Sequence, residues 1–396
     1  MHIHTSTSKT SKHILLVAYA FSTKHGSEPG AGWSMCRAHL SLDNHVTLLT
    51  RSNQISANEI ELKYYIDKKQ LKIIRIDDIR FHNLAKHIPF HIQILHFFWQ
   101  IKISKFIKSF LNTNSAILHY VTYAGDWNFN VSHFIEYPVL NLWGPVGGAQ
   151  RIPNILLRNL PLKGQFEEMI RIKIGSIFRS LIKLKIRKIQ QYKVLALNEV
   201  TFNYFNDVCE TYLCHSFIFP EFDLETVSDS SNEGYFLIAG RLISLKNVGI
   251  AIDALSEVEG KKLVIVGDGP ELRNLKKLAK LNKIEDRVIF LGNVNREQVF
   301  SLMRKSEAFI FTSLRDSYSW ALAEAIHLEV GVIALNLPGN RALIEDQKKL
   351  VSIEGDLIEN LASEMRKNTH PRFDQKYCVC KVAEKLAWAI EHSSTR

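Results

Sequence analysis

Two positively charged residues stand where a short apolar run of the sequence gives way to a helical pattern. The segment 237–246 reads LIAGRLISLK, with Arg241 directly after Gly240 and Lys246 just before the expected helix start at Val248. Glycine lets the backbone approach a ligand closely, and guanidinium and ammonium groups both bind anions. A helix N-terminus adds unpaired N–H groups and a positive dipole end. The spacing favours a phosphate or diphosphate site, with an ordinary charged surface loop as the alternative.

Two carboxylates follow a later apolar run. In LRDSYSWALAEA (314–325), Asp316 lies in the loop before a helix predicted to begin near Tyr318, and Glu324 follows Asp316 after seven residues. Carboxylates accept hydrogen bonds from sugar and ribose hydroxyl groups, and short serine side chains leave a helix start open to a phosphate. The alternative roles are a helix cap for Asp316 and an exposed helical side chain for Glu324.

Two glycine-rich segments follow predicted strands in the first half of the chain. GSEPGAGW (26–33) opens a helix predicted to run from Gly32 to Leu42, and WGPVGGAQ (143–150) follows a later strand. Both segments could bring backbone amides close to a ligand, although glycine and proline also mark ordinary turns. The glycines that could line a ligand site are Gly30, Gly32, Gly147 and Gly148.

Motifs for several other chemistries are missing from the sequence. GxxxxGK[ST], HExxH, GxSxG and GxGxxG do not occur, and no Asp-x-Asp pair follows a predicted strand to hold a metal on a diphosphate. We therefore expect no metal and no cofactor, so that protein cations and helix dipoles neutralise a bound diphosphate. His119, at the end of the apolar run 116–118, could reach the same site, with a buried structural histidine as the alternative.

Composition limits the class of protein. Of the 396 residues, 46% are hydrophobic, which excludes a disordered chain. The 50 Lys and Arg residues outnumber the 40 Asp and Glu residues, and the formal charge of +10 favours anionic partners. The sequence contains no module typical of nucleic-acid binding, so we expect no nucleic-acid partner.

Cysteine usage and hydropathy predict a cytoplasmic protein. The five cysteines lack zinc spacing and are expected to be reduced thiols. The apolar run 14–20 is followed by charged residues and by no convincing cleavage site, so it predicts a buried strand rather than a signal peptide. No run approaches the roughly 20 apolar residues that a membrane span requires.

The chemistry-bearing residues lie between elements that alternate as strand and helix. Apolar runs occur at 14–20, 46–50, 71–76, 116–121 and 137–142, and again at 235–239, 262–266, 288–291, 308–312 and 332–335. This alternation predicts an α/β protein with two facing, Rossmann-like, doubly wound lobes. Ligands of such sheets bind beyond the carboxyl ends of the strands, here in the cleft between the lobes.

The predicted domains are an N-terminal lobe at 1–217 and a C-terminal lobe at 218–374. The polar segment 224–234 is the expected linker. A C-terminal helix at about 375–396 is expected to pack back on the first lobe.

Two long segments, 91–110 and 166–189, are basic and amphipathic. In the second, apolar residues occur at 166, 170, 174, 177, 178, 181 and 182, with Arg and Lys between them. One interpretation is a core-facing helix with a solvated cationic rim. The other is peripheral docking on an anionic membrane surface.

Taken together, the motifs resemble those of family-4 retaining glycosyltransferases, which have the GT-B fold. The resemblance covers about 235–345 and weakly includes 28–33 and 143–148, which are similar to a bacterial branch acting in surface-polysaccharide assembly. The matching residues are Gly240-Arg241, Lys246, Gly267-Asp268-Gly269-Pro270, Gly292, Asp316 and Glu324-Ala325.

The resemblance implies that the lobe at 1–217 lies on the acceptor side and that the lobe at 218–374 binds the donor. It also implies roles for individual residues. Arg241 and Lys246 would bind the diphosphate of a nucleotide-sugar donor, Glu324 its ribose, and Asp316 the transferred sugar. These four are the catalytic candidates. The donor-binding candidates are Gly30, Gly32, Gly240, Gly267, Gly292, Ser317, Tyr318, Ser319 and Trp320, and those on the acceptor side are His119, Gly147 and Gly148.

The chain departs from the family pattern at several places. The family most often has Glu at the position of Asp316, and Gly and Pro where this chain has Glu329 and Gly331. Pro338-Gly339 replaces a Gly-Gly pair, and Gly144 stands where many members have a sugar-positioning histidine. The first-lobe contacts to the sugar are therefore left open.

The implied function is transfer of a hexose from a UDP- or GDP-sugar to a lipid-linked or oligosaccharide acceptor, in capsule, exopolysaccharide or lipopolysaccharide assembly. The reaction would retain the anomeric configuration and need no metal, in the cytoplasm or at the inner face of its membrane. One alternative is a nucleotide-sugar epimerase or hydrolase of the same fold. Another is a non-catalytic binding subunit of a polysaccharide complex.

Overall fold

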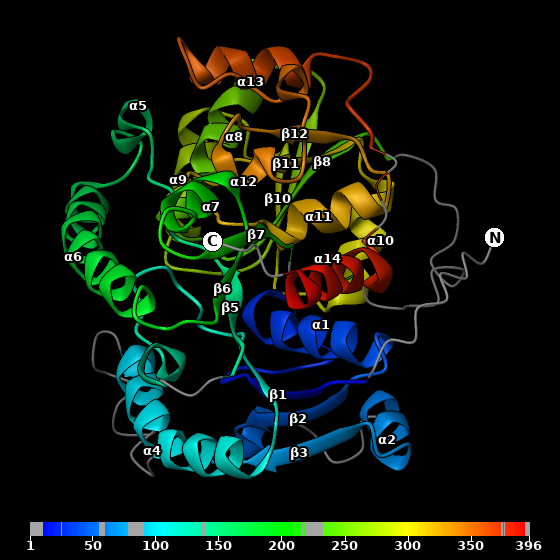
Figure 1. Ribbon diagram of the computed structural model, residues 1–396. Coiled ribbons are helices and arrows are strands. Elements are labelled where there is room, and N and C mark those ends of the chain that lie inside the picture. Colours follow the sequence, from blue (N-terminus) through cyan, green and yellow to red (C-terminus); the bar gives the residue numbers. More distant parts are fainter. Residues whose placement is uncertain are drawn as a thin grey trace.

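The chain folds into two α/β lobes, drawn in blue to green below and in green to orange above in Figure 1. This computed structural model describes residues 11–24, 26–54, 60–77, 91–135, 139–215, 218, 233–373, 375 and 377–392. Each lobe contains a parallel sheet with apolar side chains packed on both of its faces.

Within the described residues, the first sheet has seven parallel strands in the order β3-β2-β1-β4-β5-β6-β7. Its strands are β1 (His13–Val17), β2 (His45–Thr50), β3 (Leu71–Arg75), β4 (Ile117–Tyr120), β5 (Asn141–Val146), β6 (Tyr192–Ala196) and β7 (Glu210–Leu213). The helices around it include α1 (Ser27–Ser41), α2 (Ile60–Asp67), α4 (His91–Thr113), α6 (Leu162–Ile186) and α7 (Glu199–Phe205).

In the described part of the second lobe, five parallel strands follow the order β10-β9-β8-β11-β12. They are β8 (Tyr235–Ala239), β9 (Lys262–Val266), β10 (Val288–Gly292), β11 (Ala308–Phe311) and β12 (Val332–Ala334). The connecting and covering helices are α8 (Val248–Ser256), α9 (Leu272–Leu281), α10 (Arg296–Lys305), α11 (Trp320–His327), α12 (Pro338–Arg341) and α13 (Leu357–Met365).

The strands are apolar along their length because both faces of each sheet are covered. In β1, Ile14 and Leu16 join the core on one face, whereas Leu15 and Val17 join the core on the other. The register places Ile14 opposite both Val46 and Ile117. This explains why the strands read as continuous apolar runs rather than as alternating ones.

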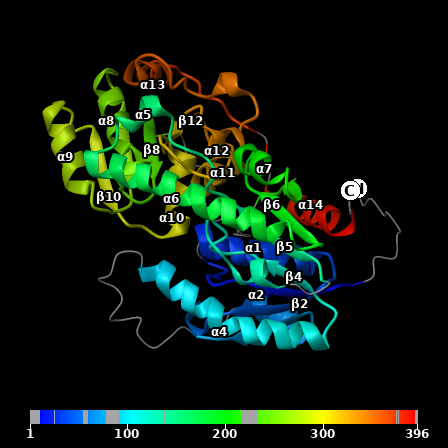
Figure 2. The same ribbon diagram turned by 60° about the vertical axis from the view of Figure 1, so that its left-hand side comes forward.

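Two segments pack on the lobe that is distant from them in sequence. The C-terminal helix α14 (Val379–Glu391) lies along α1 in Figures 1 and 2, and its apolar residues join the core of the first lobe. Residues 152–160, which include α5 (Asn154–Leu157), supply Ile152, Leu156 and Leu160 to the core of the second lobe. The chain therefore crosses between the lobes more often than a single linker would require.

Several sequence-based boundaries need correction. Helix α1 begins at Ser27 rather than Gly32, and β5 begins at Asn141 rather than Tyr137, so the WGPV residues lie inside a strand. Helix α11 begins at Trp320, two residues after the position predicted. The expected linker 224–234 lies outside the described residues apart from its last two positions.

The expectation of reduced thiols is also partly wrong. Cys378 and Cys380 form a disulfide at the start of α14, where Cys378 is the residue before the helix and Cys380 lies in its first turn. Cys36, Cys209 and Cys214 are free and buried, and burial raises the pKa of the Cys214 thiol to about 12. In the described part of the chain, no helix has the length and apolar character needed to span a membrane.

Candidate functional site

The predicted donor residues lie at the point where the strand order of the second sheet reverses. Neighbouring strands β8 and β11 stand at this point, and the loops after them carry Arg241 and Asp316. Connections leave such neighbours in opposite directions, which opens a crevice beyond their carboxyl ends. The topology therefore brings together two loops separated by about 70 residues in the sequence.

Three of the predicted glycines lie at adjacent strand ends. Gly240 follows β8, Gly267 follows β9 and Gly292 ends β10, and the N–H of Gly267 donates to the Gly292 carbonyl. Gly267 has a φ of 125°, and a Cβ there would lie 1.9 Å from the Gly240 carbonyl oxygen. A side chain at Gly267 would therefore force these two backbone segments apart, which explains why glycine occupies this position.

Lys246 and Asp316 form an ion pair across the two loops. Their Nζ and Oδ2 atoms are 2.6 Å apart, and each side chain is 27% exposed. Lys246 ends a short 3₁₀ turn directly before α8, and Asn247, in the left-handed region at φ 49°, turns the chain into that helix. The structure thus brings together the predicted diphosphate cation and the predicted sugar carboxylate.

Arg241 lies near this pair on an exposed strand end. Arg241 and Lys246 line one small cavity together with Gly240, Thr312 and Ser313. The Thr312 hydroxyl donates to the Lys246 carbonyl and fixes the two loops to each other. Both cations therefore border the same small cavity.

Glu324 is engaged by a cation that sequence analysis missed. The buried Glu324 carboxylate accepts hydrogen bonds from the guanidinium of Arg296, the first residue of α10. Burial raises the pKa of Glu324, and Arg296 opposes that shift. A capping box formed by Asn295 and Gln298 starts α10 here. The same Asn-x-x-Gln spacing in the sequence, after a strand that ends at the cleft, could have pointed to Arg296.

The loop between β11 and α11 faces the first lobe. The Ser317 hydroxyl accepts a hydrogen bond from Gln150, and the Ser317 carbonyl accepts one from Asn198. Gly147 lies so close that a Cβ there would come within 2.3 Å of the Ser317 side chain. Ser319 caps α11, since its Oγ accepts the N–H of Leu322. Ser317 therefore contacts the other lobe, in addition to any ligand role of its backbone.

Two cavities lie between the lobes beside this loop. One, of about 220 Å³, is lined by Glu28, Gly125, Gly147, Asp316 and Trp320, among others. The second is smaller, and its lining includes Gly30, Arg37, Arg296 and Trp320. Tyr318 also lines the first cavity, and its ring stacks on His215 with 5.0 Å between ring centroids. Gly30, Gly147 and Trp320 thus lie at the cleft, as predicted.

Three other predictions on the first lobe are wrong or need a different reason. His119 is fully buried, bonds to His39 and the Gly144 carbonyl, and does not reach the cleft. Gly32 lies inside α1, where a Cβ would meet the Ala20 carbonyl at 2.7 Å, so it permits helix packing rather than ligand contact. Gly148, at φ 119°, leaves room for the Asp126 carboxylate.

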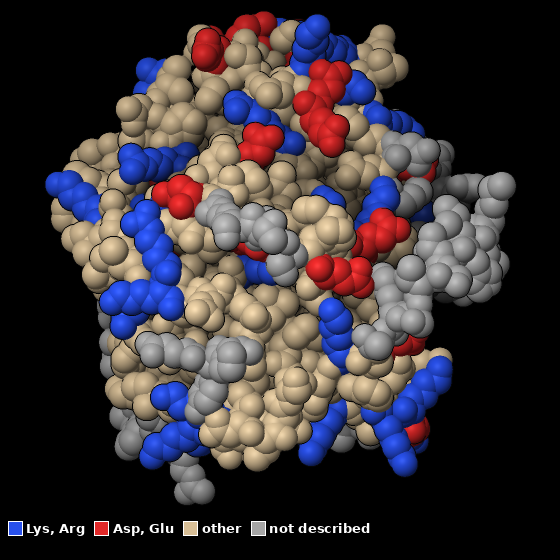
Figure 3. Space-filling view, in the orientation of Figure 1, with Lys and Arg blue, Asp and Glu red and all other residues tan. Residues whose placement is uncertain are grey.

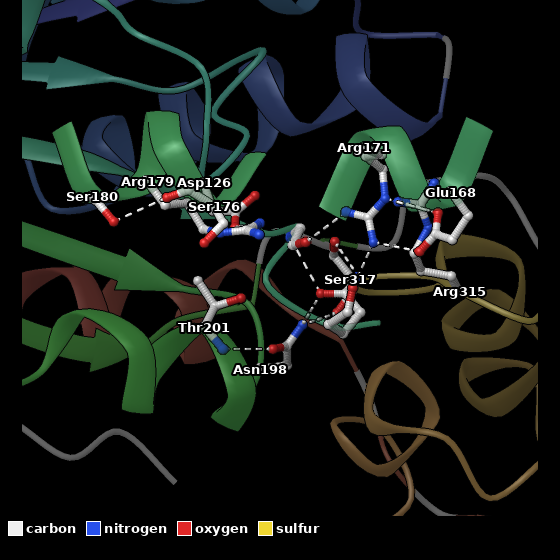
Figure 4. Close-up of polar contacts among 12 residues, drawn as sticks. Asp126, Glu168, Arg171, Ser176, Arg179, Ser180, Asn198, Thr201, Arg315 and Ser317 are labelled. Carbon is white, nitrogen blue, oxygen red and sulfur yellow. Dashed lines mark hydrogen bonds and ion pairs between the residues drawn. The ribbon is translucent and has the colours of Figure 1, made fainter. Parts of the chain in front are cut away.

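A buried group of charges at the lobe boundary was also missed. Asp126 pairs with Arg179 at 2.8 Å, and Glu168 pairs with Arg171 at 2.6 Å. Figure 4 shows both pairs along the inner side of α6, with Arg315 of the second lobe beside Glu168. Glu168, Arg171 and Arg179 belong to the segment predicted as an amphipathic helix. The spacing of its apolar residues does not indicate that these charged side chains are buried.

Comparison with known proteins agrees with the topology and with the second-lobe motifs. Residues 223–377 match the family model described as glycosyl transferases group 1. The crystal structure of HepE from Anabaena in complex with UDP-glucose has the same fold, with a TM-score of 0.57, 14% identity and coverage of 96% of this chain and 99% of that chain. The predicted two-lobed GT-B fold is therefore confirmed.

Curated relatives match over shorter segments. N-acetyl-alpha-D-glucosaminyl L-malate synthase of Bacillus anthracis is 29% identical over 119 residues, which are 29% of this chain and 31% of that protein. A Campylobacter jejuni enzyme is 29% identical over 147 residues, 35% of this chain and 40% of its own length. Its name is N-acetylgalactosamine-N,N'-diacetylbacillosaminyl-diphospho-undecaprenol 4-alpha-N-acetylgalactosaminyltransferase. The chain thus spans less than half the length of these two relatives.

Proposed function

We propose that this chain, whose second lobe is a glycosyl transferases group 1 domain, transfers a hexose from a UDP- or GDP-sugar to an acceptor hydroxyl with retention of configuration. The observation that carries the proposal is the convergence of Arg241, Lys246 and Asp316 at the strand-order reversal. The HepE structure with UDP-glucose supports a nucleotide-sugar donor for this fold.

The charges of the site suit departure of a diphosphate. As the bond from sugar to phosphate breaks, negative charge grows on the leaving oxygen, where Arg241, Lys246 and the start of α8 would stabilise it. The acceptor hydroxyl would attack from the face that the diphosphate leaves, and its proton would pass to the leaving phosphate oxygen. The proposed reaction uses these protein cations in place of a metal and needs no further cofactor.

The proposed acceptor is a lipid-linked or oligosaccharide hydroxyl in bacterial surface-polysaccharide assembly. The name of the Campylobacter jejuni relative includes a sugar on diphospho-undecaprenol, which supports a lipid-linked acceptor. The cavity lined by Gly125, Gly147 and Asp316 opens between the lobes, where an acceptor would reach a donor held on the second lobe.

The transfer reaction is tested by incubating the protein with nucleotide sugars, with and without candidate acceptors, and following products by NMR. The proposal predicts a new glycosidic bond whose anomeric proton shows the configuration of the donor. An epimerised or hydrolysed sugar with donor alone would favour the alternative enzyme of this fold. Nucleotide binding with no transfer to any acceptor would favour the non-catalytic subunit.

We further propose that the protein works at the cytoplasmic face of a membrane, which it contacts through α4 and α6. Most of the large apolar side chains of α6 point outward, although Ile182 and Ile186 join the core. The exposed apolar residues of the two helices are Ile94, Phe97, Phe98, Ile101, Leu162, Phe166, Met169, Ile170, Ile174, Ile177, Phe178, Leu181 and Leu184. So large an exposed apolar surface is unusual for a protein without a partner there.

Charge identifies the partner that this surface fits. Lys102, Lys105 and Lys108 are exposed on α4, which contains no acidic residue, and α6 carries exposed Lys163, Lys173 and Lys185. Both helices contact the turn at 131–134 and lie on the same side of the molecule in Figures 1 and 2. Lys and Arg side chains gather at the left of Figure 3, over α6. Apolar side chains with lysines beside them suit an anionic lipid surface.

Liposome flotation tests this contact. The variant Phe166→Asp/Ile177→Asp, at positions 58% and 63% exposed, should no longer float with vesicles containing phosphatidylglycerol. Leu281→Asp, 77% exposed on α9, is the matched control and should bind as the unchanged protein does. Equal binding to neutral vesicles, or a concentration-dependent dimer that the double variant abolishes, would contradict an anionic membrane as the partner.

A further inference from the structure

Helix α6 has a charged inner side that meets the donor loop of the second lobe. Glu168 is buried on this side, and its carboxylate accepts two hydrogen bonds from Arg171. The same carboxylate pairs with Arg315 at 3.4 Å. Figure 4 shows Arg171 and Arg315 on either side of Glu168. Because Arg315 directly precedes Asp316, this group lies beside the predicted sugar site.

The group carries more positive than negative charge. Arg179 is balanced by Asp126, but Arg171 and Arg315 share the single carboxylate of Glu168. The neighbouring Asp316 is engaged by Lys246. One guanidinium among these described residues therefore lacks a carboxylate of its own.

Arg315 is the cation with unused hydrogen-bonding capacity. Arg171 donates to Glu168 and to the carbonyls of Gly148 and Gln150. Among the described residues, Arg315 makes its ion pair with Glu168 and no closer polar contact, although its side chain is only 19% exposed. Burial, and next the charge of Arg171, lower the pKa of Arg315. A guanidinium has five donors, and those of Arg315 that do not face Glu168 remain available to water or to a ligand.

We propose that Arg315 binds a phosphate or diphosphate group of the acceptor, the group that links its sugar to a lipid. This inference rests on the proposed transfer reaction, which requires the acceptor hydroxyl beside Asp316. The diphosphate of the donor already has Arg241 and Lys246 in the cavity at the end of β8. An acceptor phosphate at Arg315 would lie at the inner side of α6, at the boundary between the lobes.

A clasp between the lobes is the competing explanation for Arg315. If Arg315 only held the two lobes together, we would expect a second carboxylate beside it. A buried charge without a full counter-charge destabilises the folded protein. The 3.4 Å separation from Glu168 is also longer than the 2.6 Å of the Glu168–Arg171 contact, which leaves the Arg315 fork open to another anion.

Calorimetric titration with two diphosphate probes tests the assignment. Farnesyl diphosphate represents the acceptor group, farnesol is its uncharged counterpart, and UDP represents the donor. Arg315→Gln should weaken farnesyl diphosphate binding by about 10- to 100-fold, as expected for lost charge-assisted hydrogen bonds, and leave UDP binding within about twofold. Arg315→Lys keeps the charge but loses the paired N–H donors of the guanidinium, so its affinity for farnesyl diphosphate should lie between those of the unchanged protein and Arg315→Gln.

Two matched variants distinguish this result from other losses. Arg241→Gln should weaken UDP binding and spare farnesyl diphosphate, and Arg151→Gln, an exposed arginine of the first lobe, should change neither. If Arg315→Gln weakens UDP as much as Arg241→Gln does, Arg315 serves the donor and the assignment is wrong. It is equally wrong if the unchanged protein binds farnesol as well as the diphosphate, or if Arg315→Lys melts normally and binds as Arg315→Gln does. Failure of UDP to bind at all would instead contradict the proposed function.

Discussion

At the residue scale, the two predicted carboxylates of the site are paired with cations before any ligand arrives. Lys246 is paired with Asp316, and Glu324 with Arg296. A diphosphate that enters beside Lys246 must therefore share this cation with a carboxylate. The same arrangement keeps the ammonium group close to Asp316, so that sugar and diphosphate would be bound by groups already in place.

This pairing predicts opposite effects on binding and on transfer for Asp316→Asn. Removing the competing carboxylate should strengthen UDP or GDP binding several-fold, because the full charge of Lys246 becomes available to the phosphates. Sugar transfer should fall by about 10²-fold or more, since the proposed hydroxyl contact loses its charge. Titration gives the first quantity and initial rates give the second. Weaker nucleotide binding by Asp316→Asn would contradict the competition.

Sequence analysis located the residues of the second lobe because they lie next to strand ends, where order along the chain largely sets position. Gly240, Lys246 and Asp316 fall where expected for this reason. Partners brought in from elsewhere were missed: Arg296 for Glu324, and Glu168 for Arg315. His119 was placed wrongly because the side chain of a residue at the end of a strand can point along the sheet as well as into the cleft. The imidazole of His119 instead bonds to His39.

At the element scale, the turn that follows helix α11 contains a residue with a strained backbone. Glu329 has a φ of 57°, its N–H donates to the Ile326 carbonyl, and the N–H of Val330 donates to the Ala325 carbonyl. These bonds form the turn in which glycine is the preferred residue. The family pattern noted above has Gly at this place, and the geometry explains that preference.

Glu329→Gly should therefore stabilise the protein by about 1 kcal/mol, because glycine adopts the left-handed region without the penalty of a Cβ. Urea denaturation followed by tryptophan fluorescence measures the change. Glu329→Ala is the control, since it removes the carboxylate but keeps the Cβ. A gain in stability for alanine equal to that for glycine would show that the side chain, and not the backbone, is responsible.

The period of α6 predicted the helix but left open which of its faces is buried. An apolar stripe normally faces a core, but here Phe166 and Ile177 are exposed, whereas Glu168 and Arg179 are buried. The core beneath α6 is reached mainly by Ile182 and Ile186. Periodicity shows that a helix has two faces, and tertiary contacts decide which face is buried.

At the scale of the whole molecule, several imidazoles are buried in the first lobe, where loss of hydration disfavours their charged form. Burial lowers the pKa of His96 and His133 to about 3 and that of His119 to about 4. In the unfolded chain these groups take up protons near pH 6.5. Between about pH 4 and 6.5 the unfolded state therefore binds more protons than the folded state, and acid favours unfolding.

The free energy of unfolding should accordingly be constant with respect to these groups above about pH 7 and fall as the pH drops through 6.5. At pH 5 the loss is about 2 kcal/mol for each fully neutral imidazole. Urea denaturation at pH 7, 6 and 5 measures the slope of the unfolding free energy against pH, which reports the number of protons taken up on unfolding. His119→Gln should reduce that number by about one. A free energy that stays unchanged from pH 7 to 5 would contradict the buried neutral state of these histidines.

The central claim is that Arg241 and Lys246 together bind the diphosphate of the donor. Titration calorimetry with UDP and GDP tests it most directly, using Arg241→Gln, Lys246→Gln and, as the control, Lys277→Gln on the exposed side of α9. The account predicts that each of the first two variants weakens binding of the preferred nucleotide about tenfold or more, while the control does not. Unchanged affinity in both Arg241→Gln and Lys246→Gln would contradict it.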